Sequence, residues 1–133
     1  MSWTDFLANK MLDHIFTDAA YAPPATLYWG LSTTTPTAAG TNITEPGSNN
    51  YARVAVSAAN MSAAATRSKT TAGLDLSFPT PSGSWNTVTH AVLFDGSTVG
   101  ANNALVIVDI ADRTISSGDS PKILIGGIVH SIT

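Results

Sequence analysis

Residues 27–56 read LYWGLSTTTPTAAGTNITEPGSNNYARVAV, and this stretch decides the fold. Two apolar segments, Leu27–Leu31 and Ala52–Val56, flank a long polar loop that is punctuated by proline and glycine and is nearly uncharged. Apolar segments bounded by turn residues are typical of strands. Compact domains rarely keep so long a connection without structure of its own unless it binds something or passes between sheets. The stretch therefore predicts two strands joined by a loop that contacts another surface.

The alternating pattern of these two strands continues along the chain after Pro24. The segments that read as strands are Leu27–Ser32, Ala52–Ala58, Leu74–Phe78, Thr87–Phe94, Ala104–Ile110 and Ile123–Ile132. Turn clusters rich in Gly, Pro, Ser and Asn separate them, which favours an antiparallel, jelly-roll-like β-sandwich. The nearly continuous apolar run Ala104–Ile110 is typical of a central strand. The polar, alanine-rich tract Asn60–Ala72 is expected to be a loop or an edge segment.

Before Pro23-Pro24 the pattern is helical. Residues 3–16 (WTDFLANKMLDHIF) carry a row of apolar side chains spaced by four: Trp3, Leu7, Met11 and Ile15. Ser2 is expected to cap the helix, with Asp5 three residues on as in a capping box, and the two prolines prevent helix beyond Ala22. The apolar stripe indicates either a docking arm or a helix that closes one end of the sheet core.

The 133 residues fit one domain, with residues 1–22 as the N-terminal helix and its lead-in and residues 23–133 as the β-sandwich. There is no cysteine, which excludes disulfides. Charged residues make up 11 % of the chain and the net charge is −3, so a basic patch for nucleic acid is not expected. No apolar run is long enough to cross a bilayer, and the N-terminus lacks the pattern of a signal peptide. We therefore expect neither nucleic acid nor a membrane as a partner.

No group of residues points to catalysis. The histidines His14, His90 and His130 lack metal-ligand spacing. A Ser-His-Asp set from His90, Asp95 and Ser120 lacks a nucleophile elbow. Glu45 is the only glutamate, whereas glycoside chemistry needs two facing carboxylates. We expect no enzymatic activity, no cofactor and no metal.

Two features concern contacts instead. The aromatic side chains either pack in the core or build a platform for sugars: Trp3, Trp29 and Trp85, with Tyr21, Tyr28 and Tyr51. Arg53 is the only Lys or Arg between Lys10 and Arg67 and lies at a strand start. Its guanidinium is expected to be a structural anchor for a carboxylate or loop carbonyls, with Glu45 as a candidate, unless it is a solvated surface arginine.

Several motifs together suggest a family. The first three are the opening helix at residues 2–16 (SWTDFLANKMLDHIF), the proline-led strand at 22–36 (APPATLYWGLSTTTP) and the loop at 40–46 (GTNITEP), with YARV after it at 51–54. The others are FP at 78–79 and SW at 84–85, before VTH at 88–90, and the closing SGD at 117–119 and GG at 126–127. Over nearly its whole length the chain resembles small virion proteins of tailed bacteriophages, described as capsid cement (decoration) or tail-fibre proteins. The resemblance implies a β-sandwich that binds the outside of a virion and needs no cofactor.

From the resemblance and the composition we expect a capsid cement protein that is made in the bacterial host cytoplasm and stabilises the outer capsid surface. Its partners would be the major capsid protein and further copies of itself, as a dimer or trimer. The alternative is a tail-fibre or host-recognition module that binds cell-surface glycan. The residues expected to contact the partner, with the exposed side of the helix, are Thr33, Thr34, Thr35, Pro36, Thr41, Asn42, Thr44, Glu45 and Pro46. A surface loop of this kind is expected to contribute little to the core.

Overall fold

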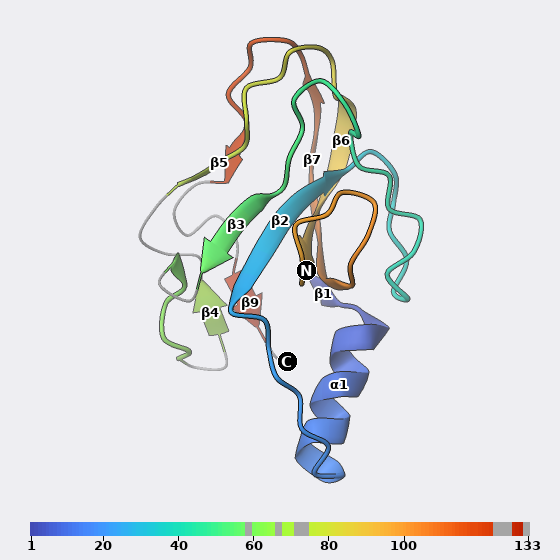
Figure 1. Cartoon of the computed structure of the whole chain (residues 1–133), viewed down its shortest axis with the longest axis vertical. Helices are drawn as coiled ribbons and strands as arrows, with labels where there is room; N and C mark the ends of the chain where they lie inside the picture. The colour runs from blue at the N-terminus through green and yellow to red at the C-terminus, as the bar shows by residue number, and fades with distance from the viewer. Residues whose placement is uncertain (58–59, 66–67, 71–74, 124–128, 132–133) are drawn as a thin grey trace.

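The computed structural model describes residues 1–57, 60–65, 68–70, 75–123 and 129–131. These residues form antiparallel strands and one α-helix near the N-terminus, which projects from one end of the molecule (Figure 1). The prediction of a mainly β chain with one N-terminal helix is confirmed.

The largest unit is a five-stranded antiparallel sheet in the order β1-β7-β6-β2-β3. Its centre is the hairpin of β6 (Asn86–Phe94) and β7 (Ala104–Ile115). On one side β6 pairs with β2 (Thr26–Ser32), which pairs in turn with β3 (Val54–Ser57). On the other side the two-residue strand β1 (Ser2–Trp3) pairs with β7. Residues 27–56 thus supply most of β2 and part of β3, which are neighbours in one sheet.

Two short ribbons accompany this sheet. In one, β4 (Ser68–Thr70) pairs with β9 (Val129–Ser131), and in the other, β5 (Leu76–Ser77) pairs with β8 (Lys122–Ile123). The described residues form one large sheet and these two ribbons, with no second large sheet to face the first. The jelly-roll-like sandwich therefore stays a prediction.

The strand boundaries differ from the predicted ones where polar residues continue a ladder. The strand expected over Ala104–Ile110 runs to Ile115, because the start of β6 pairs with residues 113–115 although they are mostly exposed and polar. The tract Asn60–Ala72 holds β4. The segment Ile123–Ile132 contributes β8 and β9, while its residues 124–128 and 132, like residues 58 and 74 of two other predicted strands, lie outside the described residues.

The helix α1 spans Asp5–Phe16, and the predicted cap at Ser2 is wrong. Thr4 caps it instead, because its buried hydroxyl accepts a hydrogen bond from Leu7 N (3.4 Å) and donates one to Ala104 O (2.6 Å) at the start of β7. Trp3, predicted as helical, is paired in β1. Ser2 does not cap the helix because it is paired with Ile107 in β1, whereas the Thr4 hydroxyl reaches the first turn of the helix.

The core lies against the main sheet and around two tryptophans. Trp29 on β2 and Trp85 just before β6 are almost fully buried, which confirms core packing for these two. Tyr51 meets Trp85 edge to face at 5.1 Å, and Trp85 Nε1 donates to Asn49 O at 2.9 Å. The end of the long loop is therefore attached to the core.

Replacing Thr4 with alanine is expected to lower the free energy of unfolding by about 2 kcal/mol, since the cap is lost and a buried carbonyl is left without its donor. Urea denaturation measures the change. The matched control is Thr114→Ala, which removes an exposed hydroxyl bonded only to Thr87 and should cost less than about 0.5 kcal/mol. Equal losses in the two variants would contradict the role given to Thr4.

Candidate binding surface

A buried ion pair lies at the base of the long loop. The side chains of Arg53 and Glu45 are 0 % and 3 % exposed, and they meet in two parallel hydrogen bonds. Arg53 Nη2 lies 2.7 Å from Glu45 Oε2, and Arg53 Nε lies 2.9 Å from Oε1. This fork geometry is the strong form of an arginine–carboxylate contact. Arg53 thus anchors Glu45 within the domain.

The other donors of Arg53 reach the connection between β6 and β7. Nη1 donates to Gly96 O (2.7 Å) and to the Asn102 side chain (3.2 Å), and Nη2 donates to Ala101 O (2.9 Å). All five guanidinium N–H groups are then used. The guanidinium carbon also lies 3.4 Å from the centre of the Phe94 ring, within cation–π range. The buried charge is fully compensated.

The carboxylate is satisfied just as completely. Besides Arg53, Glu45 accepts hydrogen bonds from the Tyr51 hydroxyl (2.8 Å) and from Gly100 N (2.9 Å). Burial alone would raise the pKa of Glu45, but the hydrogen bonds from Arg53, Gly100 and Tyr51 and the charge of Arg53 outweigh it, so the pKa lies below its usual value. Burial, followed by the charge of Glu45, raises the pKa of Tyr51. Tyr51 therefore stays a neutral donor, while its oxygen accepts from Leu31 N at 2.8 Å.

A glycine in the middle of β2 makes room for this cluster. A Cβ atom on Gly30 would lie 2.7 Å from Glu45 Oε1, 2.9 Å from the Phe94 ring and 3.0 Å from the Tyr51 hydroxyl. Glycine inside a strand often marks such a close approach. The sequence of β2 is therefore adapted to the ion pair beneath it.

The first half of the loop is braced by its own hydroxyl and amide groups. Thr33 donates from both its backbone N (2.9 Å) and its hydroxyl (3.1 Å) to Thr44 O. The Thr34 hydroxyl donates to Asn42 O, and the Asn42 amide donates back to Thr35 O. Asn42 adopts a left-handed conformation (φ 58°), which asparagine tolerates well. Many of the hydrogen-bonding groups of these residues are therefore satisfied within the loop itself.

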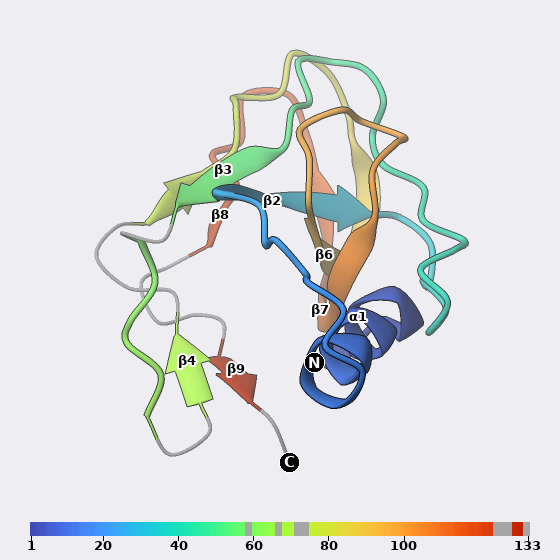
Figure 2. The same cartoon turned by 60° about the horizontal axis from the view of Figure 1, so that its bottom comes forward.

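The tip of the loop is bonded to the start of α1. Asp5 N, one of the helix N–H groups that has no partner within the helix, donates to Ala38 O at 2.8 Å. Both views show the loop and the helix side by side (Figures 1 and 2). The loop tip and the start of α1 are therefore in direct contact, while the combined contact surface suggested by the sequence stays a prediction.

The predicted contact residues divide by exposure. Thr35, Thr41, Asn42 and Thr44 are exposed, and the half-buried ones are Thr33, Thr34, Pro36, Glu45 and Pro46. The Glu45 carboxylate faces inward, so it is not available to a partner. The expectation that the loop contributes little to the core is wrong for this end, because Glu45 is the counter-ion of a buried arginine.

The helix both closes the core and leaves a face uncovered. Phe6 and Leu7 in its first turn pack against the core cluster. Further along, Leu12, Ile15 and Phe16 are 54 %, 64 % and 77 % exposed. The first half of α1 thus closes the core, as one alternative predicted. The second half leaves apolar side chains exposed, as the docking-arm alternative requires.

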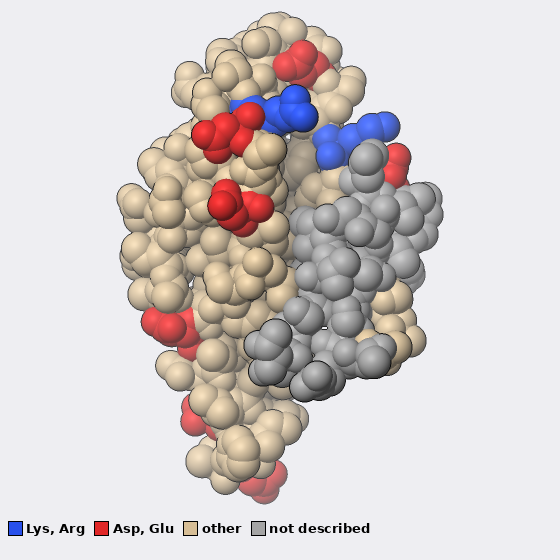
Figure 3. Space-filling view, turned by 180° about the vertical axis from the view of Figure 1, so that it is seen from behind, with Lys and Arg blue, Asp and Glu red and all other residues tan. Residues whose placement is uncertain are grey.

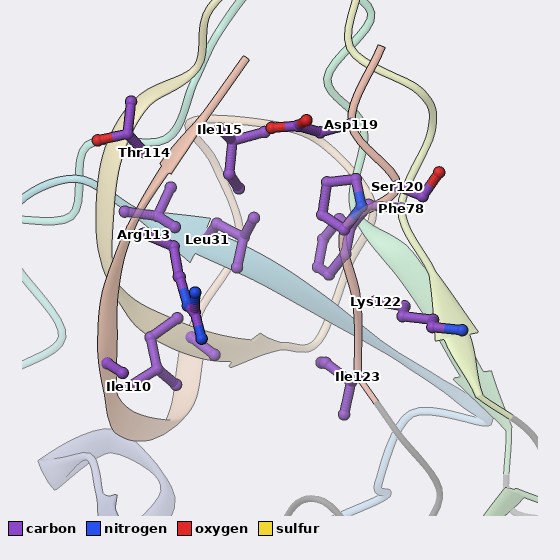
Figure 4. Close-up of a pocket in the computed structure, with 14 residues that line it drawn as sticks. Leu31, Phe78, Ile110, Arg113, Thr114, Ile115, Asp119, Ser120, Lys122 and Ile123 are labelled. Carbon is purple, nitrogen blue, oxygen red and sulfur yellow. The ribbon is translucent and has the colours of Figure 1, made fainter. Parts of the chain in front are cut away.

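A groove of about 620 Å³ opens between β7 and β8, beside Arg113 and Lys122 (Figure 4). Its described lining is mainly aliphatic, with Leu31 and Ile115 in the floor. Lys122 Nζ lies 3.7 Å from Asp75. Seen from behind, the surface is mostly uncharged, with few basic groups (Figure 3). Among the described lining residues of the groove, no acidic side chain forms an ion pair with a basic one; the partner of Lys122, Asp75, is not part of the lining.

The residues offered as a Ser-His-Asp set have other neighbours. His90 Nδ1 lies 2.8 Å from the Thr89 hydroxyl, and its Nε2 lies 3.9 Å from Asp109. Asp95 binds Asn103 across the β6–β7 connection. Within the described part of the chain no cluster of three metal-ligating side chains occurs, and no helix is long and apolar enough to cross a membrane.

Sequence reasoning missed most of the residues that complete the ion pair. Tyr51 and Arg53 are two apart, so in extended chain they lie on one face, and Gly30 interrupts an apolar strand. Both were usable signals. The backbone carbonyls of Gly96 and Ala101 carry none, because any residue could supply them.

The comparisons with known proteins identify the family. A family model described as podophage GP4 fiber I protein gp80 matches residues 2–131. The chain belongs to this family. It is a structural protein of a bacteriophage virion, of fibre type, and the resemblance to phage virion proteins is confirmed. No curated protein matches the chain.

Gly30→Ala is expected to lower the free energy of unfolding by about 1–3 kcal/mol, because the added methyl group overpacks the buried cluster. Gly47→Ala is the matched control, since nothing lies within 4 Å of a Cβ atom there. Thermal and urea unfolding of both variants measure the difference. A Gly30→Ala protein as stable as Gly47→Ala would show that the cluster yields without cost.

Arg53→Ala is expected to destabilise the protein by about 3–5 kcal/mol, since it leaves a buried carboxylate unpaired. Glu45→Gln offers a milder probe with a pH signature. The folded-state pKa of Glu45 is below its unfolded value, so its charge contributes stability above about pH 4.5, and that contribution is lost as the pH falls through the folded pKa. The gap in unfolding free energy between wild type and Glu45→Gln should therefore shrink as the pH is lowered from 7 to 3. A gap independent of pH would contradict the role of the carboxylate charge.

Proposed function

We propose that the chain is a structural subunit of a phage tail fibre, which attaches to the virion through protein–protein contacts and performs no chemical step. The observation that carries the proposal is the family match over residues 2–131, to proteins described as a fibre. The fold supports it, because the loop is braced by its own hydrogen bonds and its tip is bonded to the start of α1, which projects from one end of the molecule (Figure 1).

The physical character of this loop suits repeated attachment. Its exposed residues are mainly threonine, alanine, asparagine, serine and glycine, so contact there buries little unpaired charge. The loop is already ordered by its own hydrogen bonds, which reduces the entropy lost on binding. Many weak contacts then add up through copy number and symmetry. Self-association as a dimer or trimer belongs to the same proposal.

The host-glycan function has less support. Trp29 and Trp85, two of the three tryptophans offered as a sugar platform, are buried in the core. Capsid cement remains the second candidate for the place of the chain in the virion. The family description favours the fibre, whereas the braced and nearly uncharged loop would suit a shell surface equally well.

The test uses phage particles produced without this chain, to which the purified protein is added. Electron cryomicroscopy of the particles then locates the added protein. We expect a small set of copies at the tail. Copies spread over the whole shell would replace the fibre proposal with capsid cement, and binding to host cells without binding to particles would favour host recognition.

A point substitution at the loop tip tests the surface itself. Ala39→Arg is expected to leave the free energy of unfolding within about 0.5 kcal/mol of wild type, because Ala39 is exposed. It should weaken binding to the particles, measured by co-sedimentation. Ser117→Arg, an equally exposed site on the turn after β7, is the matched control and should bind normally. Unchanged binding by Ala39→Arg would remove the loop tip from the interface.

A further inference from the structure

The last two turns of α1 carry an apolar stripe that the domain does not cover. Leu12, Ile15 and Phe16 are three and four residues apart, so they lie together on one side of the helix. They make up three of the five large hydrophobic side chains that are exposed among the described residues. Scattered apolar residues on a surface need no explanation, but a contiguous group marks an interaction site.

The stripe is presented on a rigid element. Thr4 fixes the start of α1 to β7, Asp5 is bonded to the loop tip, and Phe6 and Leu7 are packed against the core. A partner therefore meets a helix that is already formed, although an isolated helix of this length would be marginal in water. Little ordering entropy remains to be lost when the stripe is covered.

The charges beside the stripe are acidic. At about 100° per residue, Asp13 lies next to Phe16 around the helix, and Asp5 continues the line of the stripe toward the helix start. Lys10 lies farther round, with its ammonium 5.9 Å from the centre of the Phe6 ring. From behind, acidic and no basic groups are visible along the tapering end where α1 projects (Figure 3).

This charge pattern selects the kind of partner. Residues 2–22 contain three aspartates and one lysine, so pairing the stripes of two copies would bring acidic groups together. Like charges brought together at an interface oppose association. A receiving surface with lysine or arginine at its border would instead attract the helix and orient it.

We propose that the stripe of α1 docks in an apolar groove of a different virion protein, and that lysine and arginine side chains border this groove. The proposal rests on the proposed function, because it names the partner chemistry for the attachment of the chain to the virion. It separates the contact with the virion from any self-association, which would use another surface.

The experiment adds purified variants to particles produced without this chain and measures binding by co-sedimentation across a range of salt concentrations. Leu12→Ser/Phe16→Ser should bind about tenfold or more weakly, since large buried side chains dominate interfaces, while circular dichroism and melting temperature stay as in wild type. Val99→Ser, an exposed apolar residue of the β6–β7 connection, is the matched control and should bind normally.

The charge arm uses Asp13→Lys. It should bind more weakly than wild type, and its binding should depend less on salt, because one attraction to the basic border is lost. Asp112→Lys makes the same change in net charge at an exposed position of β7 and should bind as wild type does.

The possible failures are distinct. If the wild-type protein does not bind the particles at all, the proposed function falls, and this inference with it. If the wild type binds and Leu12→Ser/Phe16→Ser binds equally well, only the inference is overturned. Tighter binding by Asp13→Lys would exclude a basic border. Conversion of a wild-type dimer to a monomer by Leu12→Ser/Phe16→Ser, seen by sedimentation, would make a second copy the occupant.

Discussion

The ion pair between Arg53 and Glu45 holds the end of the long loop, the lead-in to β3 and the β6–β7 connection together. Glu45 comes from the end of the long loop, Arg53 from the lead-in to β3, and the carbonyls that Arg53 binds from the β6–β7 connection. Taking both charges out of water is costly. The cost is offset here because every guanidinium N–H and both carboxylate oxygens have partners. The end of the long loop is thereby fixed to the rest of the domain.

Much of this arrangement was predictable from the sequence, for physical reasons. Alternation of apolar residues located β2 and β6, because it reports which face of a strand is buried. The isolation of Arg53 in an uncharged stretch pointed to an internal partner. Other features could not be predicted, because they depend on contacts between distant segments. Ser2 and Thr4 are equally good caps by type, and the pairing of Ser2 and Trp3 with β7 leaves Thr4 as the residue before the helix. The exposed end of β7 reads as loop by composition, but its pairing with β6 continues the strand.

The loop and the helix are mechanically linked, and this link connects the fold to the fibre-type family. The Thr4 hydroxyl bonds the start of α1 to β7, and the backbone N–H of Asp5 bonds it to the tip of the loop. A force applied to the helix is therefore carried into the central hairpin of the sheet and into the loop, not into a flexible tether. In the proposed attachment through α1, a load on the contact would therefore reach the sheet through the hydrogen bonds of Thr4 and Asp5.

The wide separation along the chain between Arg53 and the carbonyl groups that it binds also bears on synthesis. Arg53 and Ala101 are 48 residues apart. A ribosome that has just added Arg53 therefore needs roughly 2–10 s to produce its carbonyl partner at ordinary elongation rates. Until then the hydrogen bonds of Arg53 cannot be completed, and for most of that interval β2 has no β6 to pair with. The edge of β2 that pairs with β6 in the folded domain therefore stays unpaired until the second half of the domain has been made.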